Sequence, residues 1–285
     1  MTALGRTAAR IASVRLVRTT AALLLAITLL AVVGPLFSPH GAIDTGFDRI
    51  LAPPGLAGGH WFGTDNLGRD LFVRTLEGTR TTLLVATVAS IVSLLIGVVY
   101  GTIAGYVGGR VDAVMMRVVD TLYALPFIFL VILLMVAFER NFLLIFVAIG
   151  AVNWLDMARI VRGQTLALKE KEFIEAARLL GVPTRRVLLR HVAPNLLGVV
   201  LVYLTLTIPQ AVLVESFLSF LGLGIQEPAT SLGTLVANGV GVLEQAPWVL
   251  LIPSLFLFVI LLLFNFLGDG LRDAFDVRLA TEERQ

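Results

Sequence analysis

The sequence has no cysteine and few charged residues for its length. Its 285 residues are 57% hydrophobic and 15% charged, and lysine occurs at only two positions. The absence of cysteine excludes disulfides and thiolate metal sites. About a quarter of the residues of a soluble domain are normally charged, so this composition indicates a protein that lies in a lipid bilayer.

Sequence motifs for catalysis are also absent. Neither Lys169 nor Lys171 completes a G-x-x-x-x-G-K-[ST] sequence, so the chain has no P-loop to bind the phosphates of ATP. The sequences G-x-S-x-G and H-E-x-x-H do not occur, and the histidines lie in predicted loops or at a span end: His40, His60 and His191. We therefore expect no catalytic, cofactor or metal site in this chain.

Long uncharged segments predict an all-α, polytopic membrane protein with about six transmembrane helices. A helix needs about 20 mostly apolar residues to cross the hydrocarbon core. We predict a basic amino terminus at 1–18 and a first helix at 19–37, because no cleavage site for a signal peptide follows. A membrane core at 81–268 then contains the other five predicted spans, at 81–107, 121–138, 142–155, 192–214 and 245–268.

An even number of spans places both termini on the same side of the cell membrane. That side has 17 Lys and Arg residues, and the opposite side has 5. Basic residues accumulate in cytoplasmic loops, so we expect both termini to be cytoplasmic. The cytoplasmic segments are then 1–18, a short loop at 108–120, a basic loop at 156–194 and a polar tail at 269–285. The external segments are 38–80, a turn at 139–141, and 228–243, which we predict to hold a re-entrant or interfacial helix.

The basic loop at 156–194 is predicted to contain two helices joined by a bend. Apolar residues between 164 and 180 share one face of an amphipathic helix. Gly181 is expected to end this helix, and Pro183 and Thr184 to begin a second helix that continues to Val192. Such a helix-turn-helix is suited to docking a partner, and the alternative is a basic loop that only fixes the topology. Asp156 and Arg159, three residues apart, are predicted to pair where the loop begins.

One motif in this loop resembles the EAA loop of ABC importer permeases. The motif consists of Glu175-Ala176-Ala177, then Gly181 and the sequence His-Val-Ala-Pro at 191–194. The resemblance implies a coupling helix that fits a cleft on a cytoplasmic ATPase subunit, with a charged contact from Glu175 and a bend at Gly181. The residues implied in coupling are Glu175, Ala176, Ala177, Arg178, Gly181, His191 and Pro194.

A second motif, GTDNLGRD at 63–70, lies in the external loop. Its turn residues predict an ordered loop followed by a short helix capped by Asp65 or Asn66, with solvated Asp–Arg pairs. It resembles the GTDxxGRD signature of the C-type permease subunit of oligopeptide and dipeptide importers. The ESFLSFLGLGIQ segment and the terminal DGLRDAFD resemble the same subunit, whereas Glu227-Pro228 stands where that family often has Pro-Pro.

The resemblance implies a type I ABC importer permease that forms half of a translocation pathway for di- or oligopeptides. Nickel, glutathione and other small solutes are alternatives within the family. The implied partners are a homologous second permease, two ATPase subunits or domains that bind ATP and Mg²⁺, an external solute-binding protein and the lipid bilayer, with no nucleic acid. An ion-coupled carrier is a more distant alternative, because such carriers place ionisable groups deep in their spans and the spans predicted here are almost free of them. A non-transporting membrane scaffold is a second distant alternative.

A few polar and small residues within the spans are candidates for specific roles. Glu215 is the one carboxylate near an apolar core, and we interpret it as a hydrogen-bonded structural group. Gln210 is interpreted as a residue that forms a hydrogen bond between helices. The alternative for both Glu215 and Gln210 is a role in the pathway or an outer gate. Gly97, Gly101 and Gly105 share one helix face, which predicts close packing against another helix rather than contact with substrate.

Overall fold

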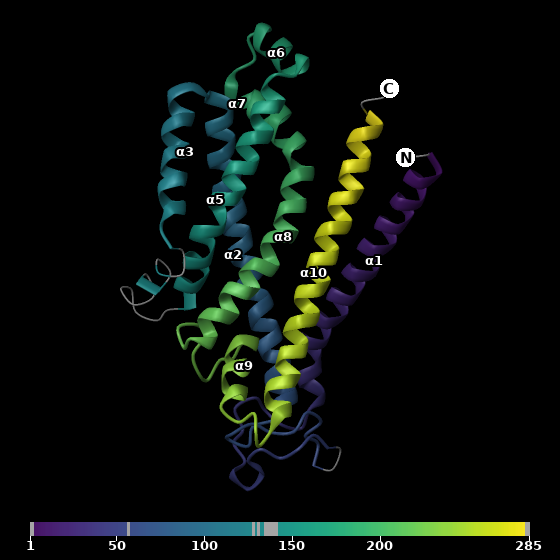
Figure 1. Ribbon diagram of the computed structural model, residues 1–285, viewed down its shortest axis with the longest axis vertical. Coiled ribbons are helices and arrows are strands. Elements are labelled where there is room, and N and C mark those ends of the chain that lie inside the picture. The colour runs from purple at the N-terminus through teal and green to yellow at the C-terminus, as the bar shows by residue number, and fades with distance from the viewer. Residues whose placement is uncertain (1–2, 56–57, 127–128, 130–131, 134–141, 283–285) are drawn as a thin grey trace. The chain divides into compact units, whose positions relative to one another are not determined.

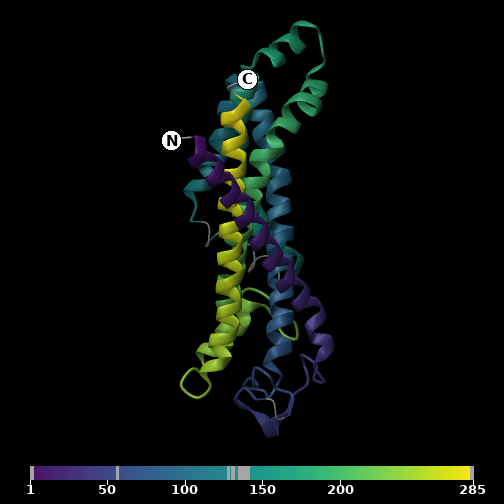
Figure 2. The ribbon, with the colours of Figure 1, turned by 90° about the vertical axis from the view of Figure 1, so that its right-hand side faces the viewer.

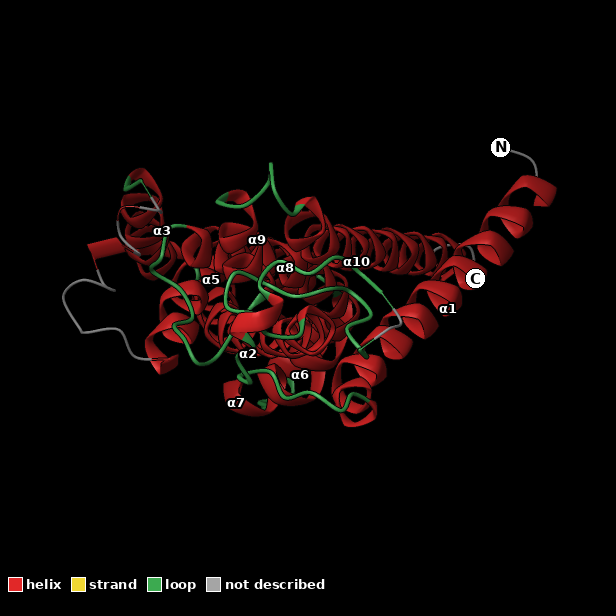
Figure 3. Ribbon diagram, turned by 90° about the horizontal axis from the view of Figure 1, so that it is seen from below, coloured by secondary structure: helices red, strands yellow, loops and turns green. Residues whose placement is uncertain are grey.

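The computed structural model describes residues 3–55, 58–126, 129, 132–133 and 142–282. Helices make up the regular structure of these residues, and an isolated bridge between Thr64 and Asp70 is their only β contact (Figure 3). This confirms the all-α class. The elements in chain order are α1 Ala3–Val33, η1 Gly34–Phe37, η2 Phe47–Arg49, α2 Leu71–Val107, α3 Gly109–Ala124, α5 Phe142–Lys169, α6 Glu172–Leu179, α7 Thr184–Val187, η3 Leu188–Val192, α8 Ala193–Phe220, α9 Leu232–Val240 and α10 Pro247–Glu282.

Four helical segments in the described part of the chain are long and apolar enough to cross a membrane. They are Arg15–Phe37, Leu71–Val107, Thr184–Phe220 and Pro247–Ala274, and they overlap the predicted first, second, fifth and sixth spans. Helix α5 covers the predicted fourth span. Half of the predicted third span at 121–138, and all of the turn at 139–141, lie outside the described residues. The chain is therefore a polytopic, all-α membrane protein, and the count of six spans stays a prediction.

Several helices begin or end where the sequence predicted loops. The predicted loop at 108–120 is wrong, because α3 occupies it after a turn at Gly108 and Gly109, whose φ angles are 72° and 59°. Helix α2 begins at Leu71, well before the predicted span. Helices α1 and α10 include most of the polar ends predicted at 1–18 and 269–285. Hydropathy locates the apolar part of a helix, but a helix continues through polar residues wherever its backbone hydrogen bonds are made.

The chain divides into two compact units. The first consists of Met1–Thr87 and Ile208–Leu271. In its core, Ile27 of α1 packs against a cluster of Leu83, Leu232 and Ile260, and α1 lies beside α10 (Figure 1). The loop before α2 packs against both α2 and α10, through a cluster formed by Leu71, Ala246 and Val249 with Leu51, Phe62 and Trp248.

The second unit consists of Val88–Thr207 and Arg272–Gln285. Its core joins α2, α5, α6, α7 and α8 through buried apolar side chains that include Tyr106, Met157, Val161, Ile174, Val187 and Leu196. Helix α6 thus shares one core with α5, which precedes it, and with α7 and α8, which follow it. A displacement of α6 is therefore transmitted to the two long helices α5 and α8.

Helices α2 and α5 approach closely along the three glycines of α2. A β-carbon at Gly97 would lie 2.5 Å from Cβ of Met157, and one at Gly105 would lie 2.8 Å from the carbonyl oxygen of Arg162. A β-carbon at Gly101 would overlap the carbonyl oxygen of Ala158. Small residues allow helix backbones to approach in this way. The close packing predicted for these glycines is confirmed.

Candidate functional site

Helix α6 is separated from α5 by a break at Glu170 and Lys171. The prediction of one continuous helix over 164–180 is therefore wrong, because Lys171 is extended, with a ψ of 140°. The break lets Ile174 and Ala177 turn into the core of the second unit, where they are 0% and 8% exposed. An amphipathic pattern shows which residues share a face, but it does not show where a helix must turn to bury that face.

The opposite side of α6 faces outward and combines charge with apolar surface. Glu175 and Ala176 are exposed, and Leu179 and Leu180 are each 83% exposed. Helix α6 projects from the end of its unit in two perpendicular views (Figures 1 and 2). Exposed apolar residues beside a carboxylate on a projecting helix are typical of a surface that binds another protein.

The bend at Gly181 ends α6 as predicted. Gly181 has a φ of 73°, a left-handed conformation that favours glycine. Its N–H donates to the carbonyl of Arg178 at 3.0 Å, and the N–H of Val182 donates to the carbonyl of Ala177 at 3.1 Å. This pair of bonds is the Schellman arrangement, which satisfies the last carbonyls of a helix. The chain is thereby turned toward α7.

The second helix of the loop begins at Thr184, directly after Pro183, as predicted. It passes through a π-helical turn, η3, into α8 without a break. His191 lies in η3, with its ring centroid 6.4 Å from that of Phe173, and its carbonyl accepts a bond from Asn195 at 2.6 Å. Pro194 lies in the first turn of α8. The continuous path from α7 into α8 gives the loop a rigid connection to a span.

Arg178 of α6 points toward α2 of the same chain, so it is not available only for a partner protein. Its guanidinium lies 4.5 Å from the centroid of the Tyr106 ring, and its Nε–H donates to the Tyr106 hydroxyl at 3.2 Å. A cation over an aromatic ring is a favourable contact. Arg178 thereby fastens α6 to the end of α2, and it positions the exposed residues around it.

Two ion pairs that sequence analysis missed join α3 to α5. Arg162 donates to both carboxylate oxygens of Asp112, at 2.5 and 2.6 Å. The hydrogen bond from Arg162 outweighs desolvation and lowers the pKa of Asp112 below its ordinary value. Arg159 pairs with Asp120 at 2.7 Å.

The predicted pairing of Arg159 with Asp156 is wrong, since the hydroxyl of Tyr123 donates to Asp156 instead. Partners 39 and 50 residues apart in the sequence leave no signal in the local spacing, because α3 itself was not predicted.

The first unit holds a buried ionic cluster at the GTDNLGRD element. Asp65 accepts bonds from the backbone N–H groups of Leu67 and Arg69 and from the Arg69 side chain, the last at 2.7 Å. The prediction of solvated pairs is wrong, because the side chains of Asp65, Arg69 and Arg74 are 3%, 5% and 1% exposed. The predicted caps are also wrong: Asp70, not Asp65 or Asn66, caps α2 by accepting from the N–H of Val73 at 2.8 Å.

Glu227 completes this cluster from a distant part of the sequence. One of its oxygens accepts from Arg69 and the other from Arg74, the latter at 3.0 Å. Sequence analysis noted Glu227 only as a departure from Pro-Pro. Arg74 lies in the first turn of α2, before the predicted span, and pairs with both Asp65 and Glu227. These carboxylates compensate its burial, because an unpaired buried guanidinium is costly.

Glu215 lies in a hydrogen-bonded polar cluster of its own. It is fully buried, and it accepts bonds from Ser219 at 2.7 Å and from Thr82 at 3.1 Å. Thr82 in turn accepts from the N–H of Leu232 at 3.1 Å. The carboxylate thus joins α8 to α2 and to the start of α9, as the structural interpretation expects. Gln210 is exposed on α8, and no hydrogen bond between it and Glu215 occurs among the described residues.

The sequence matches a known family and several characterised proteins. The family model described as "Binding-protein-dependent transport system inner membrane component" matches residues 97–281. The chain is 53% identical over 244 residues to the oligopeptide transport system permease protein OppC of Haemophilus influenzae, with 86% of this chain and 78% of that protein covered. It is 45% identical over 258 residues to the dipeptide transport system permease protein DppC of Bacillus subtilis, with coverages of 90% and 80%.

The fold is similar to that of a solved transporter. The chain superposes on one chain of the MetNI methionine ABC transporter, solved in inward-facing conformations, with a TM-score of 0.57 and 19% sequence identity. The alignment covers 72% of this chain and 96% of that one. At this level of identity the similarity establishes the fold.

Proposed function

Because the chain belongs to the family of binding-protein-dependent transport system inner membrane components, we propose that it is the membrane subunit of an ATP-driven importer of peptides. The single observation that carries the substrate class is the identity of 45–53% to oligopeptide and dipeptide permeases over most of the chain. The subunit forms one half of the translocation pathway and performs no bond chemistry itself. Nickel or glutathione is the alternative cargo.

The outward face of α6 is the part that docks on a cytoplasmic ATPase. Glu175 supplies a charge, and Leu179 and Leu180 supply apolar area that this chain leaves exposed. Ile174 and Arg178 hold α6 against α2 and α5 from the other side. Closure of the ATPases moves α6, and the shared core and the continuous α7–α8 connection transmit the displacement to the spans. Alternating access follows if the ATPases bind the two orientations of the loop with different affinity.

The assembly contains further subunits. A homologous second permease supplies the other half of the pathway, two ATPase subunits or domains bind ATP and Mg²⁺, and an external binding protein delivers the solute. The chain lies in the cell membrane with both termini cytoplasmic, in agreement with the distribution of its basic residues. Glu215 keeps its structural role in this scheme, as the group that holds α9 to α2 and α8.

The coupling proposal is tested with the assembled importer in lipid nanodiscs. We expect Glu175→Arg to lower both ATPase capture and stimulation of hydrolysis by the binding protein at least about tenfold, which corresponds to about 1.4 kcal/mol. The matched control is Glu170→Arg, the same charge change at an exposed residue between α5 and α6. If both variants behave as the wild type, the α6 face is not the docking surface.

The cargo is tested separately with the same preparation. Uptake of labelled di- and oligopeptides into vesicles should require ATP and the binding protein. Uptake of nickel or glutathione, with no uptake of peptides, would replace the peptide proposal and leave the coupling proposal intact.

A further inference from the structure

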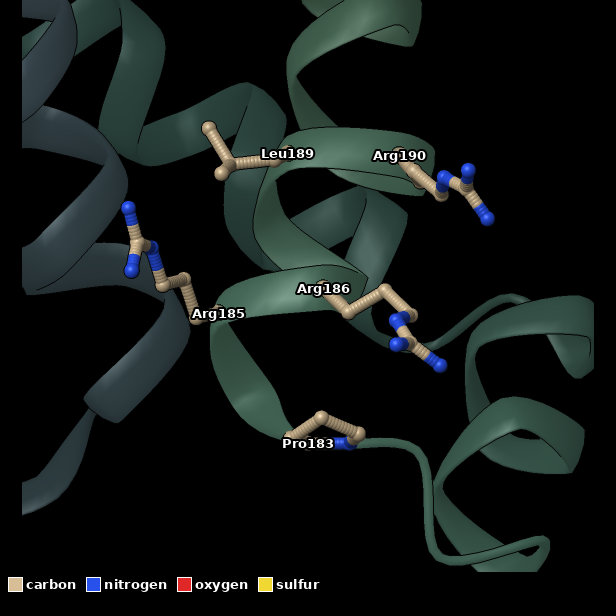
Figure 4. Close-up of a pocket in the computed structure, with 5 residues that line it drawn as sticks. All are labelled: Pro183, Arg185, Arg186, Leu189 and Arg190. Atoms are coloured by element: carbon tan, nitrogen blue, oxygen red, sulfur yellow. The ribbon is translucent and has the colours of Figure 1, made fainter.

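Three arginines gather on the outside of α7 and η3. Arg185, Arg186 and Arg190 are exposed, and together with Pro183 and Leu189 they line a shallow hollow of about 450 Å³ (Figure 4). Leu189 is itself 61% exposed. The hollow therefore combines cationic side chains with an apolar wall.

These arginines differ from Arg159, Arg162 and Arg178 of the same unit, and unlike the exposed Arg110 and Arg117 of α3 they line one hollow together. Arg159 and Arg162 are paired with carboxylates, and Arg178 lies over an aromatic ring. Within the described part of the chain, the side chains of Arg185, Arg186 and Arg190 have no hydrogen bond, ion pair or ring contact. The fold thus leaves three positive charges together without an anion.

The arrangement of two of these side chains favours an anion between them. Arg186 and Arg190 are four residues apart, and their guanidinium groups extend toward the same side (Figure 4). Like charges at this spacing destabilise a helix. A phosphate would remove that repulsion, and the planar donor fork of arginine matches phosphate oxygens in a bidentate manner.

The position of the cluster indicates where such a phosphate comes from. The continuous helical stretch that is long and apolar enough to cross the membrane begins at Thr184, and all three arginines lie in its first turns, before the apolar residues of the predicted span at 192–214. Helix α6 projects beyond α7 in both side views (Figures 1 and 2), which leaves α7 and η3 between the ATPase-docking helix and the span. Side chains at this level lie among lipid headgroups, where long basic residues extend toward the membrane surface.

We propose that Arg186 and Arg190 bind the phosphate of an anionic phospholipid headgroup, and that Leu189, which lines the same hollow, contacts the adjoining apolar part of the same lipid. The bound lipid holds the π-helical connection between the docking loop and α8. Anionic lipid is thereby a partner of the coupling loop that is separate from the ATPase. This inference does not depend on which solute the importer carries.

The test uses the assembled importer in detergent, titrated with a fluorescent phosphatidylglycerol. We expect saturable binding that is tighter than binding of the matched phosphatidylcholine probe. The double variant Arg186→Gln/Arg190→Gln should bind the anionic probe on the order of tenfold more weakly, since each basic residue near the surface contributes to attraction of anionic lipid. The control is Arg110→Gln/Arg117→Gln, which removes two exposed arginines of α3 outside the hollow.

Further arms keep the outcome decisive. The variant Arg186→Lys/Arg190→Lys keeps the charge and should recover part of the binding, so it serves if the glutamine variant does not fold. Inorganic phosphate at millimolar concentration should not displace the lipid, whereas displacement would assign the site to a free phosphate. Equal binding of both probes, or of the glutamine variant and the control, would overturn the proposal. Loss of ATPase capture with unchanged lipid binding would also overturn it and would assign the arginines to the ATPase.

Discussion

The guanidinium of Arg74 donates from Nη2 to Oε1 of Glu227 at 3.0 Å, and this bond joins the first turn of α2 to the segment between α8 and α9. The Arg74 side chain is 1% exposed, whereas that of Glu227 is 48% exposed. Arg69 binds the other oxygen of the same carboxylate. Glu227 is therefore the solvent-facing member of a cluster that holds the external loop and this segment together.

Removal of the Glu227 charge should destabilise the first unit. Glu227→Gln leaves two buried guanidinium groups with Asp65 as their remaining anion, and a buried charge without its partner is strongly destabilising. We expect a lower melting temperature of the purified protein at pH 7, measured by thermal unfolding in detergent. Glu244→Gln, at an exposed glutamate outside the cluster, is the control and should melt with the wild type.

The same cluster predicts a pH dependence. Desolvation opposes ionisation of Glu227, but the hydrogen bond from Arg69 and the charge of Arg74 outweigh it, so the pKa of Glu227 lies below its ordinary value. A depressed folded-state pKa gives stability that is present above the unfolded value of about 4.3 and is lost as the pH falls through the folded value. The difference in melting temperature between wild type and Glu227→Gln should therefore shrink as the pH is lowered from about 4.3. A constant difference would show that the charge of Glu227 is not responsible.

Alanine substitutions at two helical glycines should have different effects on stability, because only one of the glycines lies where α2 and α5 cross. A β-carbon at Gly101 overlaps α5, whereas one at Gly163, near the C-terminal end of α5, has no heavy atom within 4 Å. We expect Gly101→Ala to destabilise the protein by about 1–3 kcal/mol through overpacking. Gly163→Ala should be neutral or stabilise by up to about 1 kcal/mol, because alanine favours helix. Thermal unfolding of the two variants side by side checks this, and equal effects would contradict the close approach.

The effect of a substitution at Gly181 should depend on whether the new residue adopts a left-handed backbone conformation rather than on the size of its side chain. Its φ is 73°, yet a β-carbon there meets nothing within 4 Å. Gly181→Asn should retain most coupling, because asparagine tolerates the left-handed region, while Gly181→Val should lose it because a β-branched residue does not. ATPase stimulation by the binding protein is the measurement. Equal loss in both variants would mean that the side chain obstructs the ATPase instead.

Exchanging the two residues of the Asp112–Arg162 ion pair should restore part of the stability that is lost when Arg162 alone is replaced by aspartate. Arg162→Asp places two carboxylates together and should lower the stability by about 1 kcal/mol, the upper range for partly exposed ion pairs. The exchanged variant Asp112→Arg/Arg162→Asp should regain part of that loss, as followed by thermal unfolding. If the exchanged variant is no more stable than Arg162→Asp alone, the attraction between the two charges does not contribute to the stability of the protein.

The sequence by itself determined the class of the protein and the position of its main elements. Uncharged runs of sufficient length located the apolar helices, because the bilayer core imposes a minimum length and excludes charge. The bend at Gly181 and the start at Pro183 were predicted because local backbone conformation sets them. The spacing of Gly97, Gly101 and Gly105 indicated close packing, although it did not identify α5 as the neighbour.

Only the tertiary structure decided which distant groups meet. It buried Arg69 and Arg74 against Glu227, paired Arg162 with Asp112, and turned α6 at Lys171 so that Ile174 reaches the core. None of these contacts follows from local spacing, since each joins segments that the fold alone brings together. Charge in a sequence predicts where a residue prefers to lie, but its burial depends on whether the folded chain supplies a partner that compensates for lost hydration.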